Sequence, residues 1–317
     1  MSSSATTLLV PSLKNILFAT DFSPCSQAVL PFLHDLALRY RSTVHLVHVI
    51  PPEARTAVPM DRLPELDVDQ SDAESALRAL QASAFLNDIA NTATVERGEV
   101  WEVLGSIVEE KKIDLIVLGT HGRRGLKKLV LGSVAEQVFR LARCPVLTIG
   151  PHTTNLDMAR TNVAPILFAT DFSSGSQHAL PYAVSLARAN RSGLILLHAV
   201  PPSVAVLPSS MEAVAANLEC GAELLAHALA DARRKMERLI SAESVSTETQ
   251  EELKPEIIIE CAEASALILN TAERRRAGLI VMGAHRASEH SVAAHLPWAT
   301  VSYVVCEAHC PVLTVRS

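Results

Sequence analysis

The sequence predicts an α/β protein made of two tandem domains, each with a parallel sheet covered by helices. Short apolar runs rich in Val, Ile and Leu alternate with amphipathic segments, and the whole pattern occurs twice. Runs of this kind are typical of strands buried on both faces of a parallel sheet. Because βαβ crossovers place helices on both faces of such a sheet, the alternation predicts a layered α/β fold.

The first half contains five predicted strands and four predicted helices. The strands are the short apolar runs, and the helices are the segments with apolar residues at helical spacing. The predicted strands cover residues 15–20, 43–50, 93–97, 115–118 and 145–150. The predicted helices cover residues 26–40, 72–91, 100–111 and 134–143. Residues 51–70 are rich in Pro and Asp and are predicted to form an irregular connection.

The second half repeats the first. Ile166 to Ser173 matches Ile16 to Ser23 residue for residue, and about half of the positions from Ile16 to Pro52 recur at one constant offset. The offset then grows, because the second half has a longer middle helix region around residues 209–241. The polar segment 152–165 reads as a linker. The predicted domains are residues 13–151 and 163–317.

Composition narrows the class of protein. The formal charge of −6 and the pI near 6.1 argue against a general affinity for nucleic acid or an anionic membrane. No apolar run approaches the length of a membrane span, and the N-terminus lacks the pattern of a secretory signal. The six cysteines form neither a disulfide framework nor a CxxC pair. We therefore expect a cytoplasmic protein with reduced thiols.

A glycine-bearing loop connects the predicted strand at 115–118 with the helix that follows. It contains Gly119 and Gly122, and after nine further residues Gly132-Ser133. The backbone N–H groups and the dipole of a helix N-terminus make a site for anions, and glycine lets a phosphate come close. The alternative is an ordinary βα loop whose glycines only relieve strain, although such loops usually have just 2–6 residues.

The spacing of Gly119, Gly122 and Gly132-Ser133 resembles that of the universal stress protein family, in its ATP-binding branch. The resemblance covers nearly the whole chain, once in each half. It implies a Rossmann-like (adenine nucleotide α-hydrolase-like) domain with strand order 3-2-1-4-5. It also implies that the two domains pair through their last strands as a covalent pseudo-twofold dimer, and that two chains may be able to form a homodimer in turn.

The resemblance implies an ATP site in the first domain, with Mg²⁺ as companion ion. Asp21 would bind the ribose or the adenine, and Val49 would offer backbone hydrogen bonds to adenine. The bottom-up alternative for Asp21 is a turn or helix-capping residue. Ala19 and Thr20 would lie beside Asp21. The residues that would line the ribose and phosphates are Leu118, Gly119, Thr120 and Gly122. Those that would hold the phosphates at the helix N-terminus are Gly132, Ser133 and Val134.

The loop is also basic, and its cations either neutralise phosphates or are simply solvated. These residues are Arg123, Arg124, Lys127 and Lys128. The second half keeps Asp171 and Gly283 but places Trp298-Ala299 opposite Gly132-Ser133. We therefore expect a degenerate nucleotide site in the second domain.

The expected function is that of an ATP-binding, nucleotide-dependent regulator of the stress response, acting on an unidentified protein partner. Two alternatives stay open: an interaction module that binds no nucleotide, suggested by Leu296-Pro297-Trp298, and a weak ATP hydrolase. No nucleophile, base and orienting residue occur together, so catalysis is not expected. A zinc site would need a standard ligand spacing, and the histidines and cysteines of the second half do not show one. These are His285, His290, His295, Cys306, His309 and Cys310.

Overall fold

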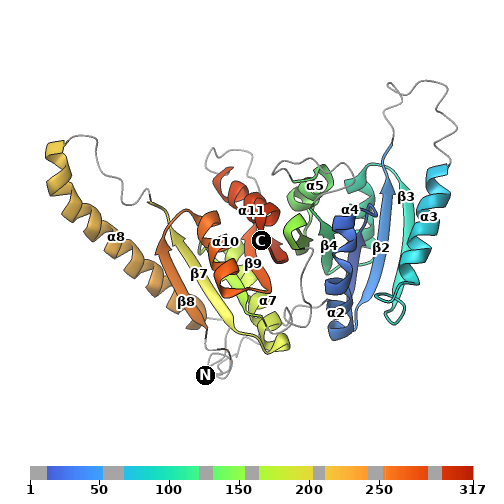
Figure 1. Ribbon diagram of the computed structural model, residues 1–317, viewed down its shortest axis with the longest axis horizontal. Helices are drawn as coiled ribbons and strands as arrows, with labels where there is room; N and C mark the ends of the chain where they lie inside the picture. Colours follow the sequence, from blue (N-terminus) through green and yellow to red (C-terminus); the bar gives the residue numbers. More distant parts are fainter. Residues whose placement is uncertain are drawn as a thin grey trace, which may run out of the picture. The chain divides into compact units, whose positions relative to one another are not determined.

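The computed structural model describes residues 13–52, 68–120, 131–153, 164–202, 211–241, 253, 255–284 and 295–316 (Figure 1). These residues form two compact units, the N-terminal unit within Ser12–Met158 and the C-terminal unit within Ala159–Ser317. In each unit the described residues contain five parallel strands with helices packed against them. The predicted α/β fold is confirmed.

The strands of the N-terminal unit are β1 (Asn15–Ala19), β2 (Thr43–Ile50), β3 (Asn91–Arg97), β4 (Leu115–Gly119) and β5 (Val146–Ile149). They lie in the order β3-β2-β1-β4-β5, as the resemblance implied. Ile16 of β1 pairs with Val44 of β2 and with Leu115 of β4, so β1 lies in the middle of the sheet. Ile16, Leu17 and Phe18 are fully buried, because a central parallel strand is covered on both faces.

The helices of this unit are α1 (Pro24–Gln27), α2 (Leu30–Tyr40), α3 (Val68–Gln81), α4 (Val100–Glu110) and α5 (Ser133–Leu141), followed by a 3-10 turn, η2 (Pro151–Thr153). Right-handed crossovers place α1, α2 and α3 on one face of the sheet and α4 and α5 on the other. In agreement, α3 packs on β2 and β3, and α4 packs against α5.

Two predicted helices of this unit have wrong bounds. The helix predicted at residues 26–40 is divided into α1 and α2 at Ala28-Val29, and Pro31 lies in the first turn of α2, where a missing N–H is tolerated. The helix predicted at 72–91 ends at Gln81, and turns follow. The Asn91 side chain donates to the carbonyls of Leu86 and Ile89, both at 2.9 Å, and so stabilises these turns. These hydrogen bonds connect the turns to Asn91, the first residue of β3. They cannot be predicted from the periodicity of apolar residues, because they depend on one polar side chain.

The C-terminal unit repeats the arrangement. Its strands are β6 (Ile166–Ala169), β7 (Leu194–Val200), β8 (Glu256–Cys261), β9 (Leu279–Ala284) and β10 (Val312–Arg316), in the order β8-β7-β6-β9-β10. Its helices are α7 (Ser174–Asn190), α8 (Met211–Leu239), α10 (Ala264–Arg275) and α11 (His295–Glu307). Unlike Pro31, Pro181 lies within a continuous helix, α7.

The longer middle helix region predicted for the second half is α8, with 29 residues against 14 in α3. Each helix buries two side chains four residues apart, Ala73 and Leu77 in α3 and Ala232 and Met236 in α8. Matching these pairs places the extra length at the N-terminal end of α8, where Figure 1 shows the helix extending past β8. Among the described helices, none is both long enough and apolar enough to cross a membrane.

Gly119 is the last residue of β4 and Gly283 the last but one of the equivalent strand β9, and both lie against the first helical turn after the central strand. A Cβ at Gly283 would lie 2.3 Å from the amide nitrogen of Ser176 and 2.4 Å from the carbonyl carbon of Gly175. At Gly119 the nearest atom would be the carbonyl carbon of Cys25, at 3.0 Å. Both glycines therefore allow close backbone packing, and the approach is much closer in the C-terminal unit.

We predict that Gly283→Ala destabilises the C-terminal unit by about 3 kcal/mol, and that Gly119→Ala costs the N-terminal unit only about 1 kcal/mol, because overpacking rises with the closeness of backbone contact. Urea unfolding followed by circular dichroism measures both. Gly193→Ala is the control, since its Cβ would make only an ordinary 3.7 Å contact with Pro165. Equal losses in the two variants would contradict this reading of the packing.

Candidate functional site

The candidate site lies at the carboxyl ends of β2, β1 and β4. Ala19, the last residue of β1, pairs with Val47 of β2 and Leu118 of β4. The chain continues in register for one more residue, because the N–H of Thr20 donates to the carbonyl of Val47 at 3.0 Å. Connections leave β1 and β4 in opposite directions, and ligands bind at this kind of switch point in open α/β sheets. The sheet thus brings together seven of the predicted residues: Ala19, Thr20, Asp21, Val49, Leu118, Gly119 and Thr120.

Asp21 lies in a tight turn between β1 and α1. Phe22 has a φ of 62°, in the left-handed region that costs a residue with a Cβ about 1–2 kcal/mol. Two hydrogen bonds of 3.0 Å stabilise this turn, from the N–H of Phe22 to Thr20 Oγ1 and from the N–H of Ser23 to Asp21 Oδ1. Asp21 therefore has the turn role that sequence reasoning allowed, while the cap of α1 is Ser23. Its role toward a nucleotide stays a prediction.

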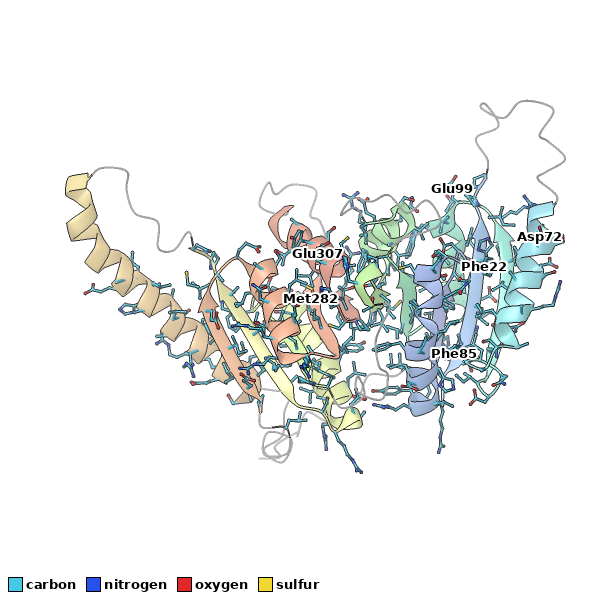
Figure 2. All side chains as sticks on the ribbon, viewed as in Figure 1. Phe22, Asp72, Phe85, Glu99, Met282 and Glu307 are labelled. Carbon is cyan, nitrogen blue, oxygen red and sulfur yellow. The ribbon has the colours of Figure 1, made fainter. Side chains whose placement is uncertain are left out.

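Two residues that sequence reasoning missed complete the turn, namely His48 of β2 and Phe22 itself. The Nδ1 of His48 lies 2.7 Å from the carbonyl oxygen of Thr20, and since a carbonyl only accepts, Nδ1 carries the proton. The imidazole also contacts the ring of Phe22, with 4.7 Å between centroids. Figure 2 shows Phe22 beside β2. The repeat contained the signal, because both residues recur in the second half as Phe172 and His198.

The N-terminus of α5 is the second part of the site. Gly132 is its N-cap residue, and the N–H of Gly132 donates to the carbonyl oxygen of Thr120 at 3.0 Å. This bond occupies the amide hydrogen of Gly132, and the role of Gly132 toward phosphate stays a prediction. A Cβ on Gly132 would lie 3.0 Å from the same oxygen, a tight contact, so glycine favours the approach of the two ends of the loop.

The next three amides of α5 differ from that of Gly132. Within the described residues, no carbonyl or side chain accepts from the N–H of Ser133, Val134 or Ala135, and no side chain caps the helix. The side chains of Ser133 and Val134 are exposed. Unpaired amides and the positive end of the helix dipole attract an anion, so the described geometry fits a phosphate at this helix end.

Part of the predicted site lies outside the described residues, namely Gly122 and the four basic residues of the loop. The C-terminal loop histidines, His285 and His290, lie outside them as well. Among the residues that the structure describes, no cluster of three or more His, Cys, Asp or Glu side chains could hold a metal ion. Burial raises the pKa of the Cys306 thiol, and it raises that of Cys310 to about 12.

The C-terminal unit contains the same turn. Phe172 has a φ of 62°, its N–H donates to Thr170 Oγ1 at 2.9 Å, and the N–H of Ser173 donates to Asp171 Oδ1 at 3.0 Å. His198 lies 2.8 Å from the carbonyl of Thr170 and contacts Phe172, with 4.4 Å between ring centroids. The first part of the site is therefore present in both units.

The second part of the site, the helix N-terminus, differs in the C-terminal unit. Aligning back from Cys144 and Cys310 places Ala299 to Val301 opposite Ser133 to Ala135. Because α11 already begins at His295, these residues are the fifth to seventh of that helix, and their amides bond within it. The position of the helix start, and not only the side chain expected at Trp298, therefore distinguishes the two units at these residues; that the C-terminal domain binds no nucleotide stays a prediction. The side chain of Trp298 lies outside the described residues.

Two doubly wound domains with this strand order define the chain as a tandem Rossmann-like protein. Both halves match the universal stress protein family, over residues 12–150 and 163–316, and the chain belongs to that family.

Relatives and solved structures agree with this membership. Universal stress protein A homolog 1 of Coxiella burnetii is 34% identical over 148 residues, which are 43% of this chain and 95% of that protein. A universal stress protein of Methanocaldococcus jannaschii is 29% identical over 138 residues, 43% of this chain and 81% of that protein. The crystal structure of a universal stress protein from Archaeoglobus fulgidus covers 95% of this chain and 98% of its own, with 23% identity and a TM-score of 0.65. Its likeness shows that the fold is shared over nearly the full chain.

We predict that acid destabilises the C-terminal unit through His198. Burial lowers the pKa of His198, with Lys235 adding to the shift, although the carbonyl of Thr170 and Asp171 act in the opposite direction. The unfolded chain, with a His pKa of about 6.5, then binds more protons than the folded one. The contribution is therefore fully present above about pH 6.5 and is lost as pH falls toward the lower folded pKa.

The measurement is the free energy of unfolding in urea at several pH values between 5 and 7.5. His198→Asn should flatten the decrease for the C-terminal unit. Burial also lowers the pKa of His45, so the N-terminal unit should keep its own acid sensitivity in this variant. An unchanged slope in His198→Asn would show that His198 does not titrate as described.

Proposed function

We propose that the N-terminal domain binds an adenine nucleotide, ATP with Mg²⁺, and that the chain regulates the stress response according to its nucleotide state. One observation carries the proposal: a carboxylate turn and a helix N-terminus with unpaired amides occur together in the N-terminal unit at the switch point of its sheet. The C-terminal unit has the turn, but the amides at the equivalent positions lie within α11, where they bond inside the helix. Membership of the universal stress protein family supports the regulatory role.

The residues divide into two groups by chemistry. Asp21 contacts the ribose or the adenine, and the backbone of Val49 contacts adenine, beside Ala19, Thr20, Leu118, Gly119 and Thr120. The amides of Ser133, Val134 and Ala135 hold the phosphates, with the Ser133 hydroxyl beside them. Gly122 and Gly132 are proposed for the phosphate side as well. Mg²⁺ would offset the charge of the polyphosphate, because it commonly binds through substrate phosphates and water.

The domain limits belong to this proposal. We place them at residues 13–151 and 163–317, with the nucleotide domain first. We also propose a cytoplasmic protein, based on its scattered cysteines and the reduced state expected for them. The C-terminal domain would then serve partner contacts in place of nucleotide binding.

Ser133→Pro tests the phosphate amides. Proline suits the first position of a helix, and the preceding Gly132 has a ψ of 147°, which proline tolerates. The substitution removes the Ser133 amide donor and leaves α5 intact, so we expect ATP affinity to fall about tenfold with little change in stability, since a hydrogen bond to a charged group contributes about 1.5–3 kcal/mol.

Ser133→Ala is the matched control, because it removes only the hydroxyl and keeps the amide. Isothermal titration with ATP, ADP, AMP and cAMP measures the affinities, and labelled ADP release in the same samples separates a binding protein from a hydrolase. If Ser133→Pro binds ATP as tightly as wild type, the amide of Ser133 does not contact phosphate.

Asp21→Asn tests the sugar side of the site. Asparagine still accepts the N–H of Ser23, so the turn is retained while the charge is lost. We expect about tenfold weaker ATP binding, because a bond to a charged acceptor contributes more than one to a neutral amide. Asp171→Asn makes the same change in the equivalent turn of the C-terminal unit and should leave titration with ATP unchanged. Equal effects of the two substitutions would place the nucleotide elsewhere.

A further inference from the structure

One imidazole contacts the residues on both sides of Asp21. On one side, His48 Nδ1–H donates to the carbonyl of Thr20 at 2.7 Å. On the other, its ring packs on the ring of Phe22, 4.7 Å away between centroids and tilted by 37°. Asp21 is the single residue between these contacts. His48 thus links β2 to the strained turn that presents the Asp21 carboxylate.

The turn needs such support because Phe22 occupies the left-handed region without being glycine. Its N–H bond to Thr20 Oγ1 lies within the turn, and Thr20 Oγ1 is in turn 3.0 Å from Ser26 Oγ of α1. The Gln27 side chain adds a 3.4 Å hydrogen bond to the carbonyl of Phe22. These contacts join the turn to β1 and α1, whereas His48 joins it to the neighbouring strand.

The C-terminal unit shows that this arrangement does not depend on the anion site. His198, Thr170 and Phe172 repeat its distances, 2.8 Å for the hydrogen bond and 4.4 Å between rings, in a unit whose helix α11 offers no unpaired amides at the equivalent positions. The equivalent histidines, His48 and His198, can therefore be substituted separately. His48 lies in the unit proposed to bind nucleotide, and His198 lies in the unit proposed not to bind it.

We propose that His48 is a positioning residue for nucleotide binding, holding Asp21 in the orientation that recognises the ribose hydroxyls. The inference rests on the proposed function of the N-terminal domain. A carboxylate offers two oxygens and about four lone-pair positions, so the bond from Ser23 to Oδ1 does not exhaust its capacity as an acceptor. The orientation of the carboxylate then decides whether a sugar diol meets it correctly.

The test compares ATP with 2′,3′-dideoxy-ATP on the full chain by isothermal titration. Wild type should prefer ATP about tenfold, as expected for a hydrogen bond to a charged acceptor, and His48→Ala should lose that preference together with affinity. His48→Asn should recover most of it, because the asparagine amide nitrogen takes nearly the place of Nδ1. His198→Ala is the matched control and should leave both titrations unchanged.

Hydrogen exchange in the protein without nucleotide gives an independent measurement. The amides of Phe22 and Ser23 should exchange faster in His48→Ala and at the wild-type rate in His48→Asn, since both bonds depend on the turn. A His48→Ala protein that still distinguishes the two nucleotides would overturn the proposal while the proposed function stands. Failure of wild type to bind ATP would overturn that function and the nucleotide role of His48, yet faster exchange would still establish His48 as the support of the turn.

Discussion

The hydrogen bond between the N–H of Gly132 and the carbonyl of Thr120 is the contact on which the candidate site depends. It joins the end of β4 to the start of α5 across the intervening loop, and it fixes where the first turn of that helix begins. Glycine favours this close approach, because a Cβ would lie 3.0 Å from the carbonyl oxygen. Within the described residues, the amides of Ser133 to Ala135 have no acceptor. The bond of Gly132 thus determines where these amides begin.

The two units show which parts of the arrangement are separable. Each has a left-handed phenylalanine after the central strand, a threonine and an aspartate that hold the turn, and a histidine from the neighbouring strand. They differ in where the helix before the last strand begins. An earlier start in α11 converts donors that would face a ligand into ordinary helical hydrogen bonds. The helix start thus differs between the two units while the strand order of the sheet stays the same.

Sequence reasoning predicted the strands well and the helix ends less well. Strands such as 115–118 are apolar along their whole length, since a central parallel strand is buried on both faces, and this signal is local. Helix ends depend on contacts that are not local. The Asn91 side chain holds turns where a helix was predicted, and the helix predicted at 26–40 is divided at Ala28-Val29 although the equivalent helix α7 is continuous. His48 was missed for the same reason, because its partners, Thr20 and Phe22, are distant in sequence.

The sequence by itself determined that the chain is a duplicated parallel α/β protein and that Asp21, Gly119 and Gly132 mark one end of a sheet. Those properties follow from periodicity, repetition and glycine spacing, which are written along the chain. Only the tertiary structure decided which groups are available to a ligand. Hydrogen-bond partners are exchanged between segments far apart in sequence, so the amide of Gly132 is used by the protein while those of Ser133 to Ala135 have no acceptor in the described residues. Whether a backbone N–H can bind a ligand depends on which segments fold against it, and this is known only from the tertiary structure.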